Sequence, residues 1–113
     1  MTTTQLLQKS IDYIEVILIT EISLSELANI SSFSTYHFCR IFTAYVGMPV
    51  AAFITKRRLY HGIYEIQAGE KATDIALLYC FNTYAGFFKA FKSEFGCSPR
   101  KYLKLYIARN QWQ

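Results

Sequence analysis

Two stretches of this chain combine cationic, hydroxyl and aromatic side chains at the spacing of an exposed helix face. The first reads T-Y-H-F-C-R from Thr35 to Arg40, and the second reads T-Y-A-G-F-F-K from Thr83 to Lys89. Arginine can donate to guanine O6 and N7 together, lysine can pair with a phosphate, and alanine can touch a thymine methyl. These residue types favour contact with a nucleic-acid groove and need no covalent step.

Each stretch opens the second member of an expected helix pair. Ser34 and Thr83 can cap these two helices, and shorter helices are expected to start before them, at Ser23 and at Thr73 or a near neighbour. Helical spacing assigns the apolar residues of the two longer helices to the core: Phe38, Ile41, Phe42 and Tyr45 in the first, Phe87, Phe88, Phe91 and Phe95 in the second. A short helix, a tight turn and a longer helix with a basic outer face form the layout of a helix-turn-helix DNA-binding unit.

The helix pair occurs twice in the sequence. Ser25-Glu26-Leu27-Ala28 matches Thr73-Asp74-Ile75-Ala76 at a separation of 48. Beyond the turn the separation is 49, and it relates Arg40 to Lys89, Phe42 to Phe91 and Gly47 to Gly96. One extra residue at the second turn explains why the separation rises from 48 to 49. The chain therefore contains two copies of one structural unit.

Three stretches resemble one known family. The most specific is I-A-L-L-Y-C-F-N-T-Y-A-G-F-F-K-A-F-K-S-E-F-G-C-S-P-R-K-Y, supported by F-S-T-Y-H-F-C-R-I-F-T-A-Y-V-G and by R-L-Y-H-G. Over nearly the whole chain the sequence is similar to the DNA-binding domain of the AraC/XylS family of bacterial transcription regulators. The resemblance implies an all-α fold of about seven helices, with two helix-turn-helix subdomains joined by a long connecting helix. We expect the subdomains at 1–48 and 68–113 and the connecting helix at 49–67.

The resemblance also implies which residues face DNA. It places Tyr36, Cys39, Arg40, Tyr84, Ala85 and Lys89 at positions that face the groove. Charge or position at a helix start adds five further expected DNA-binding residues: Thr35, Thr83, Lys92, Arg100 and Lys101. Arg40 is the first candidate for base readout, whereas Lys89 and Lys92 are expected mainly to hold phosphates. Arg100 and Lys101 sit near a helix start, where a phosphate can use both their charge and the backbone dipole. His37 is either a phosphate donor or a packing residue.

The connecting helix is expected to run from Pro49 to about Gln67. Its ~18 residues span about 27 Å, against a spacing of ~34–36 Å between successive major-groove faces, so one chain can hold two reading helices without a dimer. Gly62 stands where the family usually has alanine and should loosen the helix by up to ~1 kcal/mol. Ser32 and Cys80 stand where the family favours glycine, at a cost on the order of 1 kcal/mol each if φ is positive.

Composition and charge agree with a folded domain that meets phosphates. The chain has 113 residues, of which 52% are hydrophobic and 17% aromatic, with a net charge of +4. Residues 1–30 carry −3, residues 31–69 carry +3 and residues 70–113 carry +4. Three cysteines without C-x-x-C spacing indicate neither a disulfide framework nor a zinc site. The absence of a long apolar run or basic leader predicts a cytoplasmic protein. The resemblance implies that it is bacterial and associated with the nucleoid. Trp112 is expected to be exposed or to pack on a missing neighbour.

Two other classes of function compete with DNA binding. A protein-interaction module that keeps the fold without specific DNA binding is favoured by the poor polar complement of Tyr84, Ala85 and Gly86. An enzyme has little support, because His37 and Cys39 point to different helix faces and no paired carboxylates or phosphate loop occur. We therefore expect double-stranded DNA as the partner and no cofactor, metal or membrane. By resemblance RNA polymerase is a second partner. The chain can bind DNA as a monomer and would dimerise only through a missing domain.

Overall fold

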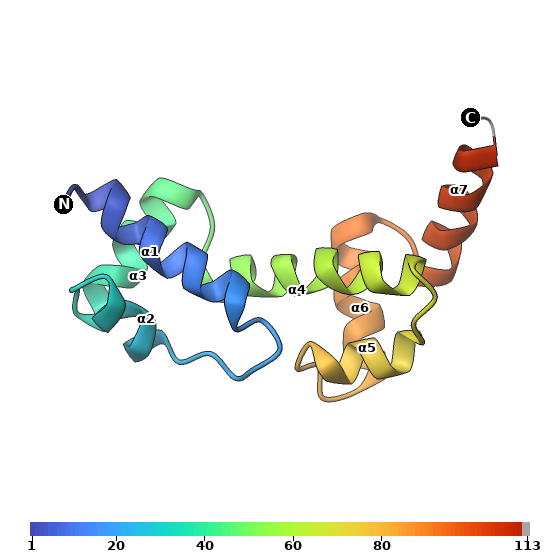
Figure 1. The fold of residues 1–113 in the computed structure, drawn as a ribbon, viewed down its shortest axis with the longest axis horizontal. Helices are drawn as coiled ribbons and strands as arrows, with labels where there is room; N and C mark the ends of the chain where they lie inside the picture. The colour runs from blue at the N-terminus through green and yellow to red at the C-terminus, as the bar shows by residue number, and fades with distance from the viewer. Residues whose placement is uncertain (112–113) are drawn as a thin grey trace. The chain divides into compact units, whose positions relative to one another are not determined.

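The computed structural model describes the backbone of residues 1–111 and the side chains of residues 1–106, so Trp112 lies outside the described residues. This part contains no strand and seven helices, which confirms the all-α fold (Figure 1): α1 (Thr3–Val16), α2 (Leu24–Ile30), α3 (Thr35–Val46), α4 (Val50–Gln67), α5 (Ala72–Leu78), α6 (Tyr84–Phe95) and α7 (Pro99–Gln111). The chain forms two compact units, residues 1–57 and residues from 58 onward, and α4 contributes to both. Across the described residues no single helix is long and apolar enough to cross a membrane; α3 and α4, bent by 58°, meet that test only as a pair.

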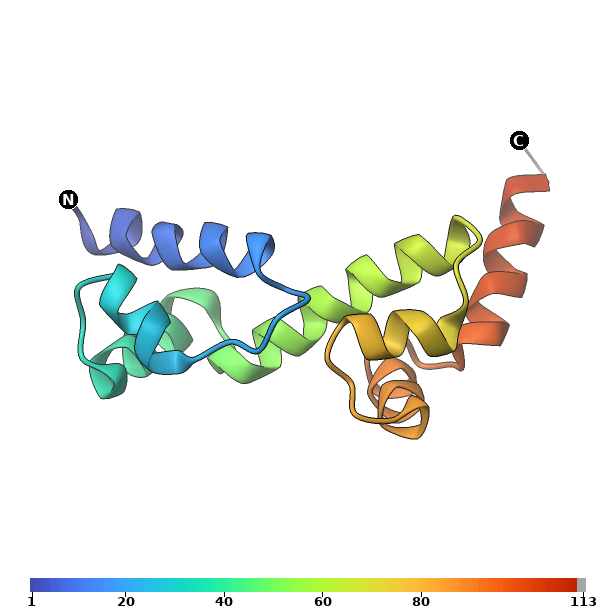
Figure 2. The same cartoon turned by 60° about the horizontal axis from the view of Figure 1, so that its bottom comes forward.

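In the first unit α1 packs on α2 and α2 packs on α3 (Figures 1 and 2). The core is built from side chains with no exposed area, Ile14, Leu27, Phe38 and Phe42. The prediction that Tyr45 joins this core is wrong, because 63% of the side chain is exposed. Tyr45 lies seven residues beyond Phe38, on the same helix face. Helical spacing therefore gave the right direction, but the core does not extend to the last turn of α3.

A buried pair of serines ties α1 to the end of α2. Ser10 Oγ donates to the Leu27 carbonyl oxygen at 2.8 Å, and Ser31 Oγ reaches the same carbonyl at 3.2 Å. The two hydroxyls also hydrogen-bond to each other, and both residues are fully buried. Because each buried hydroxyl has a hydrogen-bond partner, these bonds offset the cost of its burial and tie α1 to the end of α2.

The two turns have the backbone geometry that the sequence suggested. Ser32 has φ 62° and Cys80 has φ 68°, and these are the non-glycine residues with positive φ in the described chain. Each follows the shorter helix of its pair, and the condition under which a strain cost was expected, a positive φ, is met at both positions. The longer helices then end at Gly47, with φ 90°, and Gly96, with φ 78°. The duplication therefore extends to the backbone of turn and helix end.

Three of the expected helix caps are confirmed, and the fourth helix, α5, starts beside the expected residue but without a side-chain cap. Ser34 Oγ accepts from the backbone N–H of His37 at 3.1 Å, and Thr83 Oγ1 accepts from that of Gly86 at 3.0 Å. Ser23 caps α2 in the same way. Thr73 does not cap α5, because α5 begins at Ala72 after Lys71, which makes no side-chain cap. Asp74 still lies in the first turn, where its negative charge interacts favourably with the positive end of the helix dipole.

In the second unit α5 packs on α6 and α6 packs on α7. Phe87 and Phe91 have no exposed area and form the centre of the core. The Phe95 ring stacks on Phe91 at 4.3 Å between centroids and meets the Tyr102 ring edge-on at 5.1 Å, which brings α7 into the same aromatic cluster. Phe95 is half-buried in this position.

Tyr79 ties the end of α5 to α4. Its side chain is 7% exposed. Burial, together with its hydrogen bond to the Glu65 carboxylate, raises the pKa of Tyr79 to about 12. The raised pKa reflects a protonated hydroxyl that donates to the Glu65 carboxylate and ties the end of α5 to the connecting helix.

Gly62 is the point at which α4 meets α5. A Cβ atom at this position would lie 3.2 Å from Ile75 Cγ2, 3.8 Å from the Phe87 ring and 3.9 Å from the Tyr79 ring. The glycine expected only to loosen the helix thus allows a close approach between helices. At the repeat separation of 48, Gly62 corresponds to the fully buried Ile14, and Tyr79 corresponds to the fully buried Ser31. The second unit therefore combines a small residue on the helix with a large one at the turn, where the first unit has the reverse.

Candidate nucleic-acid interface

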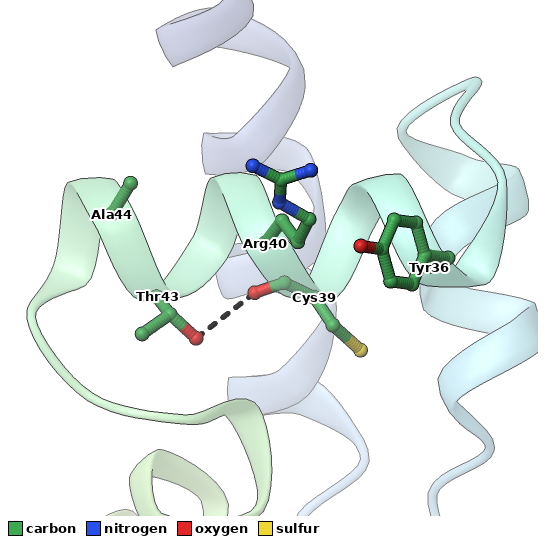
Figure 3. Close-up of a pocket in the computed structure, with 5 residues that line it drawn as sticks. All are labelled: Tyr36, Cys39, Arg40, Thr43 and Ala44. Atoms are coloured by element: carbon green, nitrogen blue, oxygen red, sulfur yellow. Dashed lines mark hydrogen bonds between the residues drawn. The ribbon is translucent and has the colours of Figure 1, made fainter.

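The exposed face of α3 carries the four residues expected there. Thr35, Tyr36 and Arg40 are exposed and Cys39 is half-buried, because Phe38 and Phe42 direct the opposite face into the core. Figure 3 shows the side chains that line a hollow on this face: Tyr36, Cys39, Arg40, Thr43 and Ala44. The structure thus brings the α3 residues together on one accessible surface.

Arg40 lies beside the ring of Tyr36. Its guanidinium carbon is 5.6 Å from the ring centroid, within the range of a cation–π contact, and the two side chains are one helical turn apart. The Tyr36 side chain is 72% exposed, so the pair stands on the surface. A planar guanidinium held against a ring has fewer conformations to lose when it forms a bidentate contact.

The other polar groups on α3 are less available for hydrogen bonds to a ligand. Thr43 Oγ1 donates to the Cys39 carbonyl oxygen at 2.9 Å, as drawn in Figure 3. The Cys39 thiol is half-buried and is a weak donor. The imidazole of His37 lies 5.2 Å from the Phe33 ring, which favours the packing role over phosphate contact. Tyr36 and Arg40 are therefore the side chains of this α3 surface best placed to contact a ligand.

The exposed face of α6 carries fewer polar groups. Tyr84, Ala85, Lys89 and Lys92 are exposed, and Tyr84 is 39% exposed. The oxygen of Thr83, also exposed, is occupied as the helix cap. The predicted residues again share one surface, but its cations are two lysines, which act as point charges and do not offer a planar fork.

Phe88 was missed as a surface residue. The prediction that it is part of the core is wrong, because 37% of its side chain is exposed. Phe87 and Phe91 are one helical turn apart and occupy the buried stripe, so the neighbouring Phe88 is turned by about 100° toward solvent. Its ring lies 6.3 Å from that of Tyr84. The sequence held one signal for this, the four-residue spacing from Tyr84.

Two further cations lie at the start of α7. Arg100 and Lys101 are both exposed in its first turn. Ser98 accepts from the backbone N–H of Lys101 at 3.1 Å and caps the helix. The positive end of a helix and two cationic side chains therefore occur at one place, as expected for a phosphate contact.

These features define a helix-turn-helix domain with two copies of the motif, each presenting the start of its second helix. The family model described as "Helix-turn-helix domain" matches residues 27–105. The transcriptional activator AarP of Providencia stuartii is 36% identical over 91 residues, covering 80% of this chain and 67% of AarP. The chain therefore belongs to the helix-turn-helix transcriptional regulators of the AraC type.

Further relatives agree with this family. The helix-turn-helix-type transcriptional regulator YbfP of Bacillus subtilis is 36% identical over 108 residues. This match covers 92% of this chain but 37% of YbfP, so the chain spans well under half of that relative. The fold matches a crystal structure from Chromobacterium violaceum, described as a transcriptional regulator with an AraC-type DNA-binding domain. The TM-score is 0.82 at 19% identity, over 88% of this chain and 89% of the other.

A second solved structure is the DNA-binding domain of the transcriptional factor AdpA in complex with a target DNA. It matches with a TM-score of 0.81 and 19% identity, over 95% of this chain and 97% of that chain. At this identity the likeness concerns the fold alone.

Proposed function

We propose that this chain binds double-stranded DNA in a sequence-specific manner and regulates transcription. Each unit would insert the start of its second helix, α3 or α6, into one of two adjacent major-groove segments. The observation that carries the proposal is the exposed Arg40–Tyr36 pair at the start of α3, because arginine is the side chain best suited to read guanine. The family membership and the fold shared with the DNA-bound domain of AdpA support it.

Several finer features of this function belong to the same proposal. The name of AarP supports an activator, which would contact RNA polymerase as well as DNA. The duplicated motif allows one chain to occupy two groove segments as a monomer. A bacterial cytoplasmic location follows if the protein acts on the chromosome.

The lysines of α6 give the first test of the proposal. Lys89→Ala and Lys92→Ala should each weaken binding to all duplexes alike and flatten the salt slope by about one unit, because each removes one phosphate contact. The measurement is fluorescence anisotropy on a duplex selected from a random pool and on its scrambled version, between about 50 and 200 mM salt. Lys9→Ala removes the same charge from the exposed surface of α1 and should leave both affinities near wild type.

The same titration separates DNA recognition from the competing function. The apolar face of α6 favours a protein-interaction module that has lost DNA specificity. Such a module would bind the selected and scrambled duplexes equally. A specific regulator should prefer the selected duplex by roughly a thousandfold or more at physiological salt.

A further inference from the structure

The start of α6 carries an apolar reading surface, formed by the exposed parts of Tyr84, Ala85 and Phe88. Tyr84 is 39% exposed, Phe88 is 37% exposed and Ala85 is exposed between them. The Tyr84 and Phe88 rings lie 6.3 Å apart between centroids. Ala85 precedes Phe88 by three residues, so all three side chains share one helix face. This surface lies in the first turns of α6, the part of the second helix that meets bases in a helix-turn-helix unit.

The exposed part of this surface lies outside the core. Phe87 and Phe91 are fully buried and complete the core beneath it. Phe88 lies at the edge of this core, turned by about 100° from Phe87, and 37% of the residue is exposed to solvent. Covering its exposed ring with another apolar group lowers the free energy, because apolar surface is removed from water.

The side chains around the surface restrict what can cover it. Lys89 and Lys92 are exposed on the same helix and add two positive charges beside the rings. From Tyr84 to Phe95 the sequence has no arginine, asparagine, glutamine or histidine. Lys89 and Lys92 are therefore the side chains of α6 best able to hydrogen-bond a base, and they do so as point charges without the planar fork of arginine. A matching ligand is a polyanion that presents apolar groups between its charges. In the major groove of DNA only thymine presents such a group, its C5-methyl.

We propose that α6 recognises thymine by packing Phe88, with Tyr84 and Ala85, against thymine methyl groups in the major groove. This inference rests on the proposed function and deepens it for the second unit. The two reading helices then differ in chemistry. α3 selects by the hydrogen bonds of Arg40, and α6 selects by apolar contact while its lysines hold the phosphates.

Replacing thymine with uracil tests the inference, because uracil keeps every hydrogen-bonding group and lacks only the methyl. Bound duplexes are selected from a random pool by the full chain, and each thymine of the selected site is then replaced in turn by uracil. Wild-type protein should lose about fourfold in affinity for each methyl that Phe88 covers, the worth of burying one such group.

Variants at Phe88 connect that loss to the side chain. Phe88→Ser should bind thymine and uracil duplexes equally, whereas Phe88→Leu, which keeps an apolar group, should keep part of the difference. Tyr64→Ser removes another aromatic, 72% exposed on α4, and should retain the wild-type difference. Circular dichroism of each variant checks its helix content. The uracil series on wild-type protein does not depend on any variant folding.

The outcomes separate the two proposals. Enrichment of a sequence without any loss on uracil replacement would overturn thymine readout and leave DNA recognition standing. A Phe88→Ser protein that remains as sensitive to the methyl as wild type would also overturn it. If no sequence is enriched from the thymine pool, sequence-specific binding itself fails, and the inference fails with it.

Discussion

Arg40 and Phe88 show two ways in which single side chains can give a duplicated fold different reading properties. Arg40 is related to Lys89 by the repeat, so the first unit has a planar cation where the second has a point charge. Arg40 lies beside the ring of Tyr36, which supports its guanidinium. Under the proposed function, base discrimination by hydrogen bonding would therefore be concentrated in α3.

Replacing Arg40 tests this assignment. Arg40→Ala should cost ~1–3 kcal/mol and relax discrimination at one base pair, because a bidentate contact to guanine is lost. Arg40→Lys is the matched control, since it keeps the charge. It should retain the salt slope while losing the same discrimination. The measurement is the affinity for the selected duplex and for each of its single-base variants. Identical base preferences in all three proteins would remove Arg40 from the reading surface.

The contact between Gly62 and Tyr79 explains a glycine that weakens its own helix. In the interior of α4 it costs up to ~1 kcal/mol relative to alanine. The gain from a Cβ would be opposed by Ile75 Cγ2, only 3.2 Å away. A Cβ at position 62 would lie 3.9 Å from the Tyr79 ring, so a larger side chain there would compete with that ring for space and the two positions should be energetically coupled.

A double-mutant cycle measures this coupling. Gly62→Ile should destabilise by about 1–3 kcal/mol through overpacking, and Tyr79→Ser by about 3–5 kcal/mol through the cavity it leaves. The double variant has the residue types of the first unit at both positions. Its loss of stability should be smaller than the sum of the two single losses by about 1 kcal/mol or more. Combining Gly62→Ile with Tyr64→Ser, on the exposed surface, should be additive. Chemical denaturation followed by circular dichroism gives the free energies of unfolding. Strict additivity in both pairs of substitutions would contradict the coupling between Gly62 and Tyr79.

The helix pairs are the elements in which local rules are most visible. The turn between α2 and α3 and the turn between α5 and α6 each place a non-glycine residue at positive φ, in the same position of the repeat. These residues carry backbone strain that glycine would not. Family members that have glycine there are expected to form the turn at a lower energetic cost.

Ser32→Gly should therefore stabilise the first unit by on the order of 1 kcal/mol. Ser32 is exposed, so little packing is lost with its side chain. Ser25→Gly is the opposite control, because Ser25 lies inside α2, where glycine is a poorer helix former than serine and should lower stability by a few tenths of a kcal/mol. Hydrogen exchange of the α3 amides reports on this unit alone. Equal shifts of the same sign in both variants would rule out strain at the turn.

The connecting helix α4 joins the two units as a single helix of 18 residues. Its buried residues divide between the units, with Val50 and Ile54 before the boundary and Leu59, Ile63 and Ile66 after it. Near the boundary Arg57 Nε donates to Glu15 Oε1 at 2.5 Å, which fastens the helix to α1. A continuous helix makes the second binding event intramolecular, so both units can contribute to the affinity of one chain.

Insertions at this boundary test whether both units bind together. Two alanines added after Arg57 rotate the second unit by about 200° around the helix, which should prevent simultaneous binding and shorten the footprint to one groove segment. Four alanines rotate it by about 400°, close to a full turn, and should restore part of the longer footprint. Nuclease protection on the selected duplex makes the measurement. Full-length protection by the two-alanine protein would show that the units do not act on adjacent segments.

Most of the architecture followed from the sequence, because the forces that define it are local. Ser34 and Thr83 cap helices through hydrogen bonds to backbone three residues away, and Gly47 and Gly96 end them through their own φ. The duplication at 48 and 49 residues and the exposed position of Arg40 were readable for the same reason. The 3.6-residue period gives the direction of a side chain from sequence spacing alone.

The exposure of Phe88 and Tyr45 and the role of Gly62 came only from the folded chain. Spacing gives the direction of a side chain but not how far the neighbouring helix extends to cover it. Tyr45 lies beyond the edge of its core, and Phe88 lies at the side of one that Phe87 and Phe91 already fill. The space available to a side chain at position 62 depends on the distance between α4 and α5. The neighbours that limit it, Ile75 and Tyr79, lie 13 and 17 residues further along the chain. Such contacts are properties of packing between elements, and packing is not encoded in any single element.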